Sequence, residues 1–149
     1  MNDPNETYDV ENSFPMLIGT CVKYMRDSLN HRFRDAGFNV TSEQWILLVH
    51  LAQQDGISQQ DLADRYHRSK VSAFNLIKKL EKRDLIIRRP DPVDGRRNRV
   101  FLTAKGRRLQ HALIPLAKKN IAHMSRGVAD EDIDRMKTIV RKITANLKR

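Results

Sequence analysis

Apolar residues recur every three or four positions over much of the chain, a pattern typical of amphipathic helices. The first such stripe begins near Phe14 and precedes Gly37, a residue type that often ends helices. A second helix is expected to begin at Thr41, because Thr41 and Gln44 have the spacing of a capping box. The apolar stripe of the first helix comprises Leu17, Ile18, Cys21, Val22, Met25, Leu29 and Phe33.

The middle of the chain predicts two shorter helices. Asp55 and Gly56 interrupt the apolar pattern, and a short third helix is expected over residues 58–66. Residues 69–83 place apolar side chains on one face and several lysines toward the other. This fourth helix is therefore expected to have a basic outer surface.

A β-hairpin and two long helices are expected to follow. Residues 85–89 and 99–103 have strand character and flank a turn rich in Pro, Asp and Gly. Thr103 is expected to cap a helix bent at Pro115, and Asp130 to cap the last helix. The last helix has apolar residues at the spacing of a coiled-coil seam, namely Ile133, Met136, Val140, Ile143 and Leu147.

The length and residue usage favour one mainly α-helical domain. A chain of 149 residues can bury one core, so we expect a single α+β domain over residues 13–149, preceded by a flexible tail at 1–12. No stretch is apolar enough to span a membrane, and the polar N-terminus lacks a signal layout, so a cytoplasmic protein without a membrane partner is expected. The single cysteine and the scattered histidines predict no disulfide, no metal site and no cofactor.

Positive charge is concentrated in one third of the sequence. The formal net charge is +10, with 28 basic and 18 acidic residues, and residues 65–108 hold 15 of the basic and 4 of the acidic ones. That segment therefore carries +11 and the rest of the chain −1. Such a concentration predicts a surface that binds a polyanion, although a solvated charged face is the simpler alternative.

The expected hairpin carries the most specific motif. Residues 94–103, DGRRNRVFLT, resemble the wing signature of the MarR family, which is D-x-R-x-x-R followed by apolar residues and Leu-Thr. Residues 80–86, LEKRDLI, are similar to the exit of that family's recognition helix, and the order of helices agrees over about the whole chain. The resemblance implies a winged helix-turn-helix lobe at 41–103 with a small β-hairpin wing, and dimerisation helices at 13–37 and 104–149.

The resemblance also implies that the fourth helix reads DNA. Val71, Ser72 and Asn75 match positions that face bases. The Val71 side chain suits contact with a thymine methyl, the Ser72 hydroxyl can donate or accept, and the Asn75 amide can make two hydrogen bonds to adenine. Lys78 and Lys79 are better placed for phosphates, which give affinity without sequence information. The full set expected on this helix is Arg68, Ser69, Lys70, Val71, Ser72, Asn75, Lys78 and Lys79.

In the wing, Arg96 and Arg97 resemble tip residues that enter a minor groove, where a guanidinium senses groove width and negative potential. The family pattern implies that Asp94 pairs with an arginine, plausibly Arg99, and so holds the hairpin in shape. A solvated basic loop is the alternative for these residues.

Two residues depart from the family pattern. Asp84 stands where relatives commonly have Gly, and Asp tolerates a left-handed backbone less well. Phe74 is bulky for an exposed position of a recognition helix, so it either packs against the neighbouring helix, which we favour, or contacts DNA.

The function implied is that of a homodimeric repressor that binds a pseudo-palindromic double-stranded operator. The resemblance further implies release by a small-molecule effector, often an aromatic acid, bound between the dimerisation helices and the DNA lobe. Residues that could line such a cleft are Met25, His31, Trp45 and His111, although ordinary core or surface positions explain each of them as well.

Three other functions fit the sequence less well. An enzyme is disfavoured, because the sequence has no nucleophile elbow, Gly-rich phosphate loop or zinc-binding helix motif. A nonspecific architectural or RNA-binding protein would share the basic charge but needs exposed wedge or stacking residues. A thiol-sensing repressor would use Cys21, which lies about one turn later than the sensor cysteines of relatives and on the apolar stripe, so a buried structural cysteine is favoured.

Overall fold

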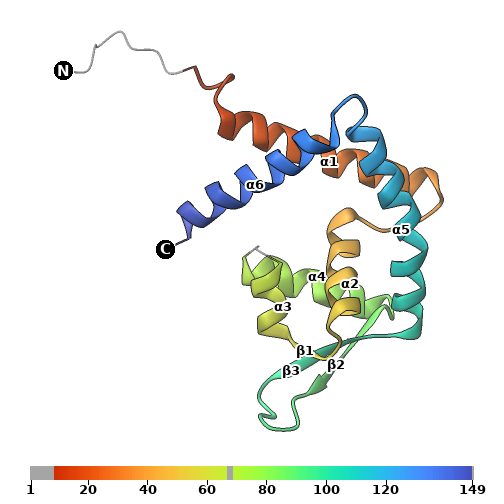
Figure 1. Cartoon of the computed structure of the whole chain (residues 1–149). Coiled ribbons are helices and arrows are strands. Elements are labelled where there is room, and N and C mark those ends of the chain that lie inside the picture. The colour runs from red at the N-terminus through yellow and green to blue at the C-terminus, as the bar shows by residue number, and fades with distance from the viewer. Residues whose placement is uncertain (1–8, 67–68, 149) are drawn as a thin grey trace.

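The computed structural model describes residues 9–66 and 69–148, and it confirms a mainly helical fold with a small sheet. Residues 1–8 of the expected tail lie outside this description. The elements are α1 (Phe14–Asp35), α2 (Ser42–Gln53), β1 (Ile57–Ser58), α3 (Gln59–Arg65), α4 (Lys70–Lys82), β2 (Ile86–Pro90), β3 (Asn98–Leu102), α5 (Ala104–Met124) and α6 (Asp130–Leu147). Helices α1 and α6 lie at one end of the molecule and the sheet at the other, with α5 joining the two ends (Figure 1).

Hydroxyl side chains cap four of the helices, and two of these caps, Thr41 and Thr103, are the ones that the sequence predicts. The capping box of α2 is present, with Thr41 Oγ1 accepting from the Gln44 amide at 3.2 Å and Gln44 Oε1 accepting from the Thr41 amide at 3.1 Å. Ser58, Ser69 and Thr103 cap α3, α4 and α5 in the same way.

The predicted cap of the last helix is wrong by one residue. Ala129 occupies the N-cap position of α6 without a side-chain hydrogen bond, and Asp130 is the first helical residue. Asp130 lies in an acidic first turn, where negative charge interacts favourably with the helix dipole.

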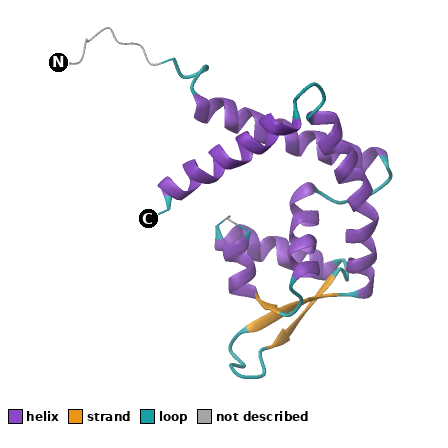
Figure 2. Ribbon diagram, in the orientation of Figure 1, coloured by secondary structure: helices purple, strands orange, loops and turns teal. Residues whose placement is uncertain are grey.

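The strands, orange in Figure 2, gather at one end of the molecule. They form one antiparallel three-stranded sheet in the order β1-β3-β2. The two longer strands are the predicted hairpin, whereas β1 was missed. It contains only Ile57 and Ser58, and two residues are too few to display an alternating pattern. Ile57 pairs with Val100, so β1 anchors the start of α3 to the hairpin.

The main core lies between α2, α3, α4 and the inner face of the sheet. Phe74 is partly buried against this core, which confirms that it packs inward. A smaller core between α1 and α5 contains Phe33 and Leu113, and the Trp45 ring meets Phe33 edge to face at 5.8 Å. Because α5 packs against both α1 and α2, it connects the two cores.

Much of α1 and most of α6 remain exposed in the single chain. No residue of α6 is buried, and the first half of α1 exposes large apolar side chains such as Leu17 and Ile18. The expectation that Cys21 is buried is wrong for the single chain, since Cys21 lies on the exposed first half of α1, whereas the same stripe is buried farther along at Phe33. None of the described helices is long and apolar enough to cross a membrane.

Candidate nucleic-acid interface

Helix α4 turns one face into the core and the opposite face outward. Ala73, Ile77 and Leu80 are fully buried, and this anchors the helix on the lobe. The described residues of the predicted DNA-reading set are all exposed, and they are Ser69, Lys70, Val71, Ser72, Asn75, Lys78 and Lys79. Arg68 lies outside the described residues.

The first turn of α4 presents a mixed surface. Ser69 Oγ accepts from the Ser72 amide at 3.2 Å and donates to Ser72 Oγ at 2.9 Å, so capping engages both hydroxyls. The side chain of Val71 is an apolar group 69% exposed beside them. Such a surface has the size and chemistry to contact base edges in a major groove, where apolar and hydroxyl contacts both occur.

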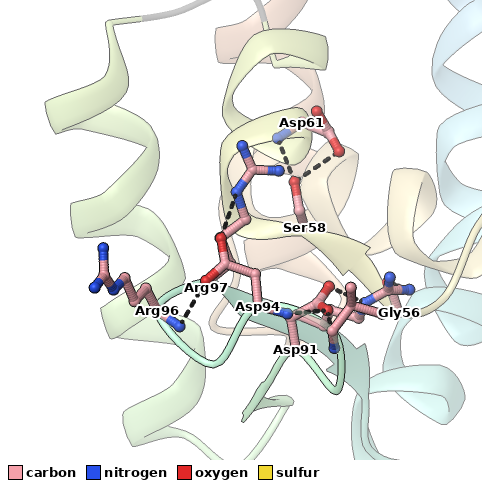
Figure 3. A network of polar contacts seen from close by, with 9 residues as sticks. Gly56, Ser58, Asp61, Asp91, Asp94, Arg96 and Arg97 are labelled. Atoms are coloured by element: carbon pink, nitrogen blue, oxygen red, sulfur yellow. Dashed lines mark hydrogen bonds and ion pairs between the residues drawn. The ribbon is translucent and has the colours of Figure 1, made fainter.

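The wing loop between β2 and β3 is built around one buried carboxylate (Figure 3). The Asp91 side chain is only 10% exposed, and it accepts hydrogen bonds from the Val93 amide at 2.8 Å and from Arg99 Nε at 2.6 Å. The Asp94 amide adds a third bond at 3.2 Å. The Arg99 bond, followed by the two amide bonds, lowers the pKa of the Asp91 carboxyl to about 2.

Asp94 therefore pairs with an arginine as expected, but its partner is Arg97, and the predicted partner Arg99 is wrong. Asp91 directly follows β2, and Arg99 lies on β3 next to the residue that pairs with Pro90, so the register brings Asp91 to Arg99. Asp94 lies farther out on the loop, where it accepts from the Arg96 amide at 3.1 Å and lies 3.7 Å from Arg97 Nε. Asp94 thus stabilises the tip of the loop, whereas Asp91 stabilises its base, where the loop joins β2 and β3.

Arg99 also ties the wing to the rest of the lobe. Its Nη1 donates to the Gly56 carbonyl at 3.4 Å, immediately before β1. This leaves Arg96 and Arg97 as the exposed cations of the loop, with 67% of the Arg97 side chain accessible. Arg97 and Ser58 line one small hollow, so the tip lies near the start of α3 (Figure 3).

A second ion pair, which the sequence did not reveal, joins the hairpin to α4. Arg88 Nη2 lies 2.6 Å from Glu81 Oε2, and both side chains are about one-third exposed. The hydrogen bond lowers the pKa of Glu81 and raises that of Arg88. Because the partners lie on a helix and a strand, helical spacing could not have indicated this contact.

A hollow of about 740 Å³ lies between α1 and α5. It is lined by Tyr24, Asp27, Ser28, His31, Arg32, Asp35, Ala36, Leu116, Lys119 and His123. Of the four residues expected in an effector cleft, only His31 is found here.

The four candidate residues do not line one hollow of the single chain. Trp45 belongs to the core between α1 and α5, where its Nε1 donates to the Gln110 carbonyl at 3.2 Å. His111 borders a separate, smaller hollow with Arg107 and Arg108. Met25 is half-buried on α1 and lines neither hollow. Within the described residues, no group of His, Cys, Asp and Glu could hold a metal ion.

The sequence and the fold are both similar to those of known proteins. Residues 40–97 match the family model described as MarR family. The chain is 25% identical over 136 residues to the HTH-type transcriptional regulator YybA of Bacillus subtilis, covering 89% of this chain and 87% of YybA. It is 25% identical to MepR of S. aureus, solved as a DNA complex, with a TM-score of 0.81 and coverage of 94% and 100%.

The fold is also similar to that of BpsR of Bordetella bronchiseptica. The TM-score is 0.85 at 21% identity, covering 93% of this chain and 98% of BpsR. That structure concerns the regulation of BpsR's DNA binding by 6-hydroxynicotinic acid.

Proposed function

We propose that the chain is a DNA-binding transcriptional regulator of the MarR family, and that it acts as a homodimeric repressor released from its operator by a small-molecule effector. The observation that carries the proposal is that the lobe has two exposed basic elements, the outer face of α4 and the tip of the wing loop. The two tip arginines, Arg96 and Arg97, lie on a loop whose base is fixed by the Asp91–Arg99 contact. Helix α4 would enter the major groove, and Arg96 and Arg97 the adjacent minor groove.

The dimer is supported by the uncovered apolar faces of α1 and α6. Met136, Ile139 and Val140 are each more than 40% exposed, which is unusual for so many large apolar side chains on one helix of a monomer. A two-fold axis through these helices would present two α4 helices to one face of DNA. The operator would then have two half-sites about 34 Å apart and a pseudo-palindromic sequence.

The effector site is proposed to be the hollow between α1 and α5. Its volume lies within the range of small-molecule sites, and Arg32, Lys119 and His31 could pair with a carboxylate, while Tyr24 offers an aromatic face. The lining residue Ser28 is held in place, because its Oγ donates to Oδ1 of the buried Asn120 at 2.7 Å. The aromatic acid named for BpsR is consistent with this chemistry.

The proposal is tested by selecting duplexes from a randomised pool with the purified full chain. The chosen sequence should contain inverted half-sites, and its affinity should exceed that for random duplex by roughly 1000-fold or more at fixed salt. Arg96→Ala combined with Arg97→Ala should weaken binding, and Asn75→Ala should reduce sequence preference more than nonspecific affinity.

A matched control removes two cations far from the wing. Lys118→Ala combined with Lys142→Ala lowers the net charge by the same amount on exposed positions of α5 and α6. This control should bind the selected duplex with nearly wild-type affinity. Equal losses in both double variants, or no preference for any duplex, would favour a nonspecific architectural or RNA-binding protein instead.

A further inference from the structure

The C-terminal end of α4 is held by the side chain that begins α2. Gln44 Oε1 accepts from Arg83 Nη1 at 3.2 Å and from the Thr41 amide at 3.1 Å. One amide oxygen therefore completes the capping box of α2 and also fixes Arg83, the C-cap residue of α4. Capping a helix requires only the first of these contacts.

The same end of α4 is held from α5. Lys105 Nζ donates to the Arg83 carbonyl at 2.8 Å, and Thr103 Oγ1 donates to the Asp84 carbonyl at 2.6 Å. Thr103 is itself the N-cap of α5 and accepts from the Gly106 amide at 3.0 Å. The N-terminal ends of two helices thus converge on the last turn of α4.

The start of α2 is in turn attached to α1. Asn30 Oδ1 accepts from the Ser42 amide at 2.7 Å, and Ser42 is the first residue of α2. The contacts of Asn30 with Ser42 and of Gln44 with Arg83 therefore join α1 to α4 through a single turn of α2. Helix α1 carries both the uncovered apolar face and one wall of the hollow.

We propose that Gln44 and Arg83 are positioning residues that set the orientation of α4 relative to α1 and α5. The inference rests on the proposed role of α4 in reading an operator. The buried apolar face of α4 fixes how deeply the helix packs on the rest of the lobe. A directional hydrogen bond at the end of the helix also resists its rotation about, and its translation along, the helix axis. The Arg83–Gln44 contact is such a bond, and its donor is charged.

The test measures the ratio of affinities for the selected duplex and for a scrambled duplex of equal composition, at fixed salt. Gln44→Ala leaves every cation in place and should lower this ratio by roughly fivefold or more. Gln44→Glu retains both accepting positions, as capping boxes with Glu do, and should keep the ratio near that of the wild type.

Two further variants separate positioning from capping. Thr41→Ala removes the hydroxyl that caps α2 but leaves the Gln44–Arg83 contact, so the affinity ratio should be nearly unchanged. Arg83→Met leaves the capping box intact and should lower the ratio as Gln44→Ala does. In a double variant, Gln44→Ala should then have no additional effect, because its partner is already absent.

The outcomes are distinct. The positioning role is overturned if Gln44→Ala keeps the wild-type ratio, if Thr41→Ala lowers it equally, or if the two losses add in the double variant. Should Gln44→Ala not fold, Arg83→Met measures the same contact. A wild-type chain without preference for any duplex would overturn the proposed function and this inference together.

Discussion

Arg99 Nε donates a 2.6 Å hydrogen bond to Asp91 Oδ2 and thereby joins the end of β2 to the start of β3. With the Val93 and Asp94 amides also donating to it, this carboxylate has its pKa lowered from 3.8 to about 2. A carboxyl with a depressed pKa in the folded state contributes stability above its unfolded pKa, and that contribution disappears as pH falls to the folded pKa. The contribution of Asp91 should therefore be complete above about pH 4 and lost between about pH 4 and 2.

Replacing Asp91 with Asn should remove this acid dependence. We expect Asp91→Asn to be less stable than the wild type at pH 6, with the difference shrinking as pH is lowered toward 2. Urea unfolding followed at several pH values measures this. Asp94→Asn is the matched control, because Asp94 is half exposed and its contact with Arg97 is 3.7 Å long, so its loss should be smaller. Parallel pH profiles for the wild type and Asp91→Asn would contradict the assignment.

Asp84 adopts a left-handed backbone, with φ of +57°, at the end of α4. The Leu85 amide donates to the Leu80 carbonyl and the Asp84 amide to the Glu81 carbonyl, which is the bonding of a Schellman motif. Glycine pays no steric penalty here, so Asp84→Gly should raise the free energy of unfolding by roughly 0.5 kcal/mol. Asp84→Ala should lower it by a similar amount, as urea unfolding would show. The prediction fails if the alanine variant is the more stable of the two.

Structural features that depend on residues close together in the sequence, such as helix caps, could be predicted. The caps at Thr41 and Thr103 depend on residues three positions later, and both are found as expected. The partner of Arg99 depends instead on strand register, which decides between two acidic residues three positions apart. Sequence spacing alone does not fix this choice.

The contents of the expected effector cleft were less predictable for a related reason. His31 and Trp45 both lie on helices that contact α5, so helical periodicity brings them to the same region. Which of them faces the small core and which faces the hollow depends on how α1 and α2 cross α5. The Gln44–Arg83 contact spans 39 residues and likewise depends on the packed arrangement.

Gly106 is required by a close backbone approach. A Cβ atom at this position would overlap the Leu85 carbonyl oxygen, which accepts from the Thr103 amide just before α5. Gly106→Ala should therefore lower the free energy of unfolding by about 2 kcal/mol or more, since backbone rather than a flexible side chain must move. Chemical unfolding is the measurement, with Gly95→Ala as control because nothing lies within 4 Å of its added Cβ. Equal stabilities of the two variants would show that the hairpin shifts freely against α5.

The apolar stripe of α6 gives the most direct prediction about association. Val140 is 43% exposed at the centre of this stripe, and it would be buried if a second copy covered α6. Val140→Glu would place an unpaired charge in that interface, so association should weaken by at least about 100-fold. Thr138→Glu adds the same charge on the opposite face of α6, where Thr138 Oγ1 donates to the Asp134 carbonyl one turn earlier. Sedimentation equilibrium at micromolar concentration should find a dimer for the wild type and Thr138→Glu and a monomer for Val140→Glu. A dimer in all three would mean that α6 lies outside the interface, and a monomeric wild type would remove the basis for two recognition helices on one operator.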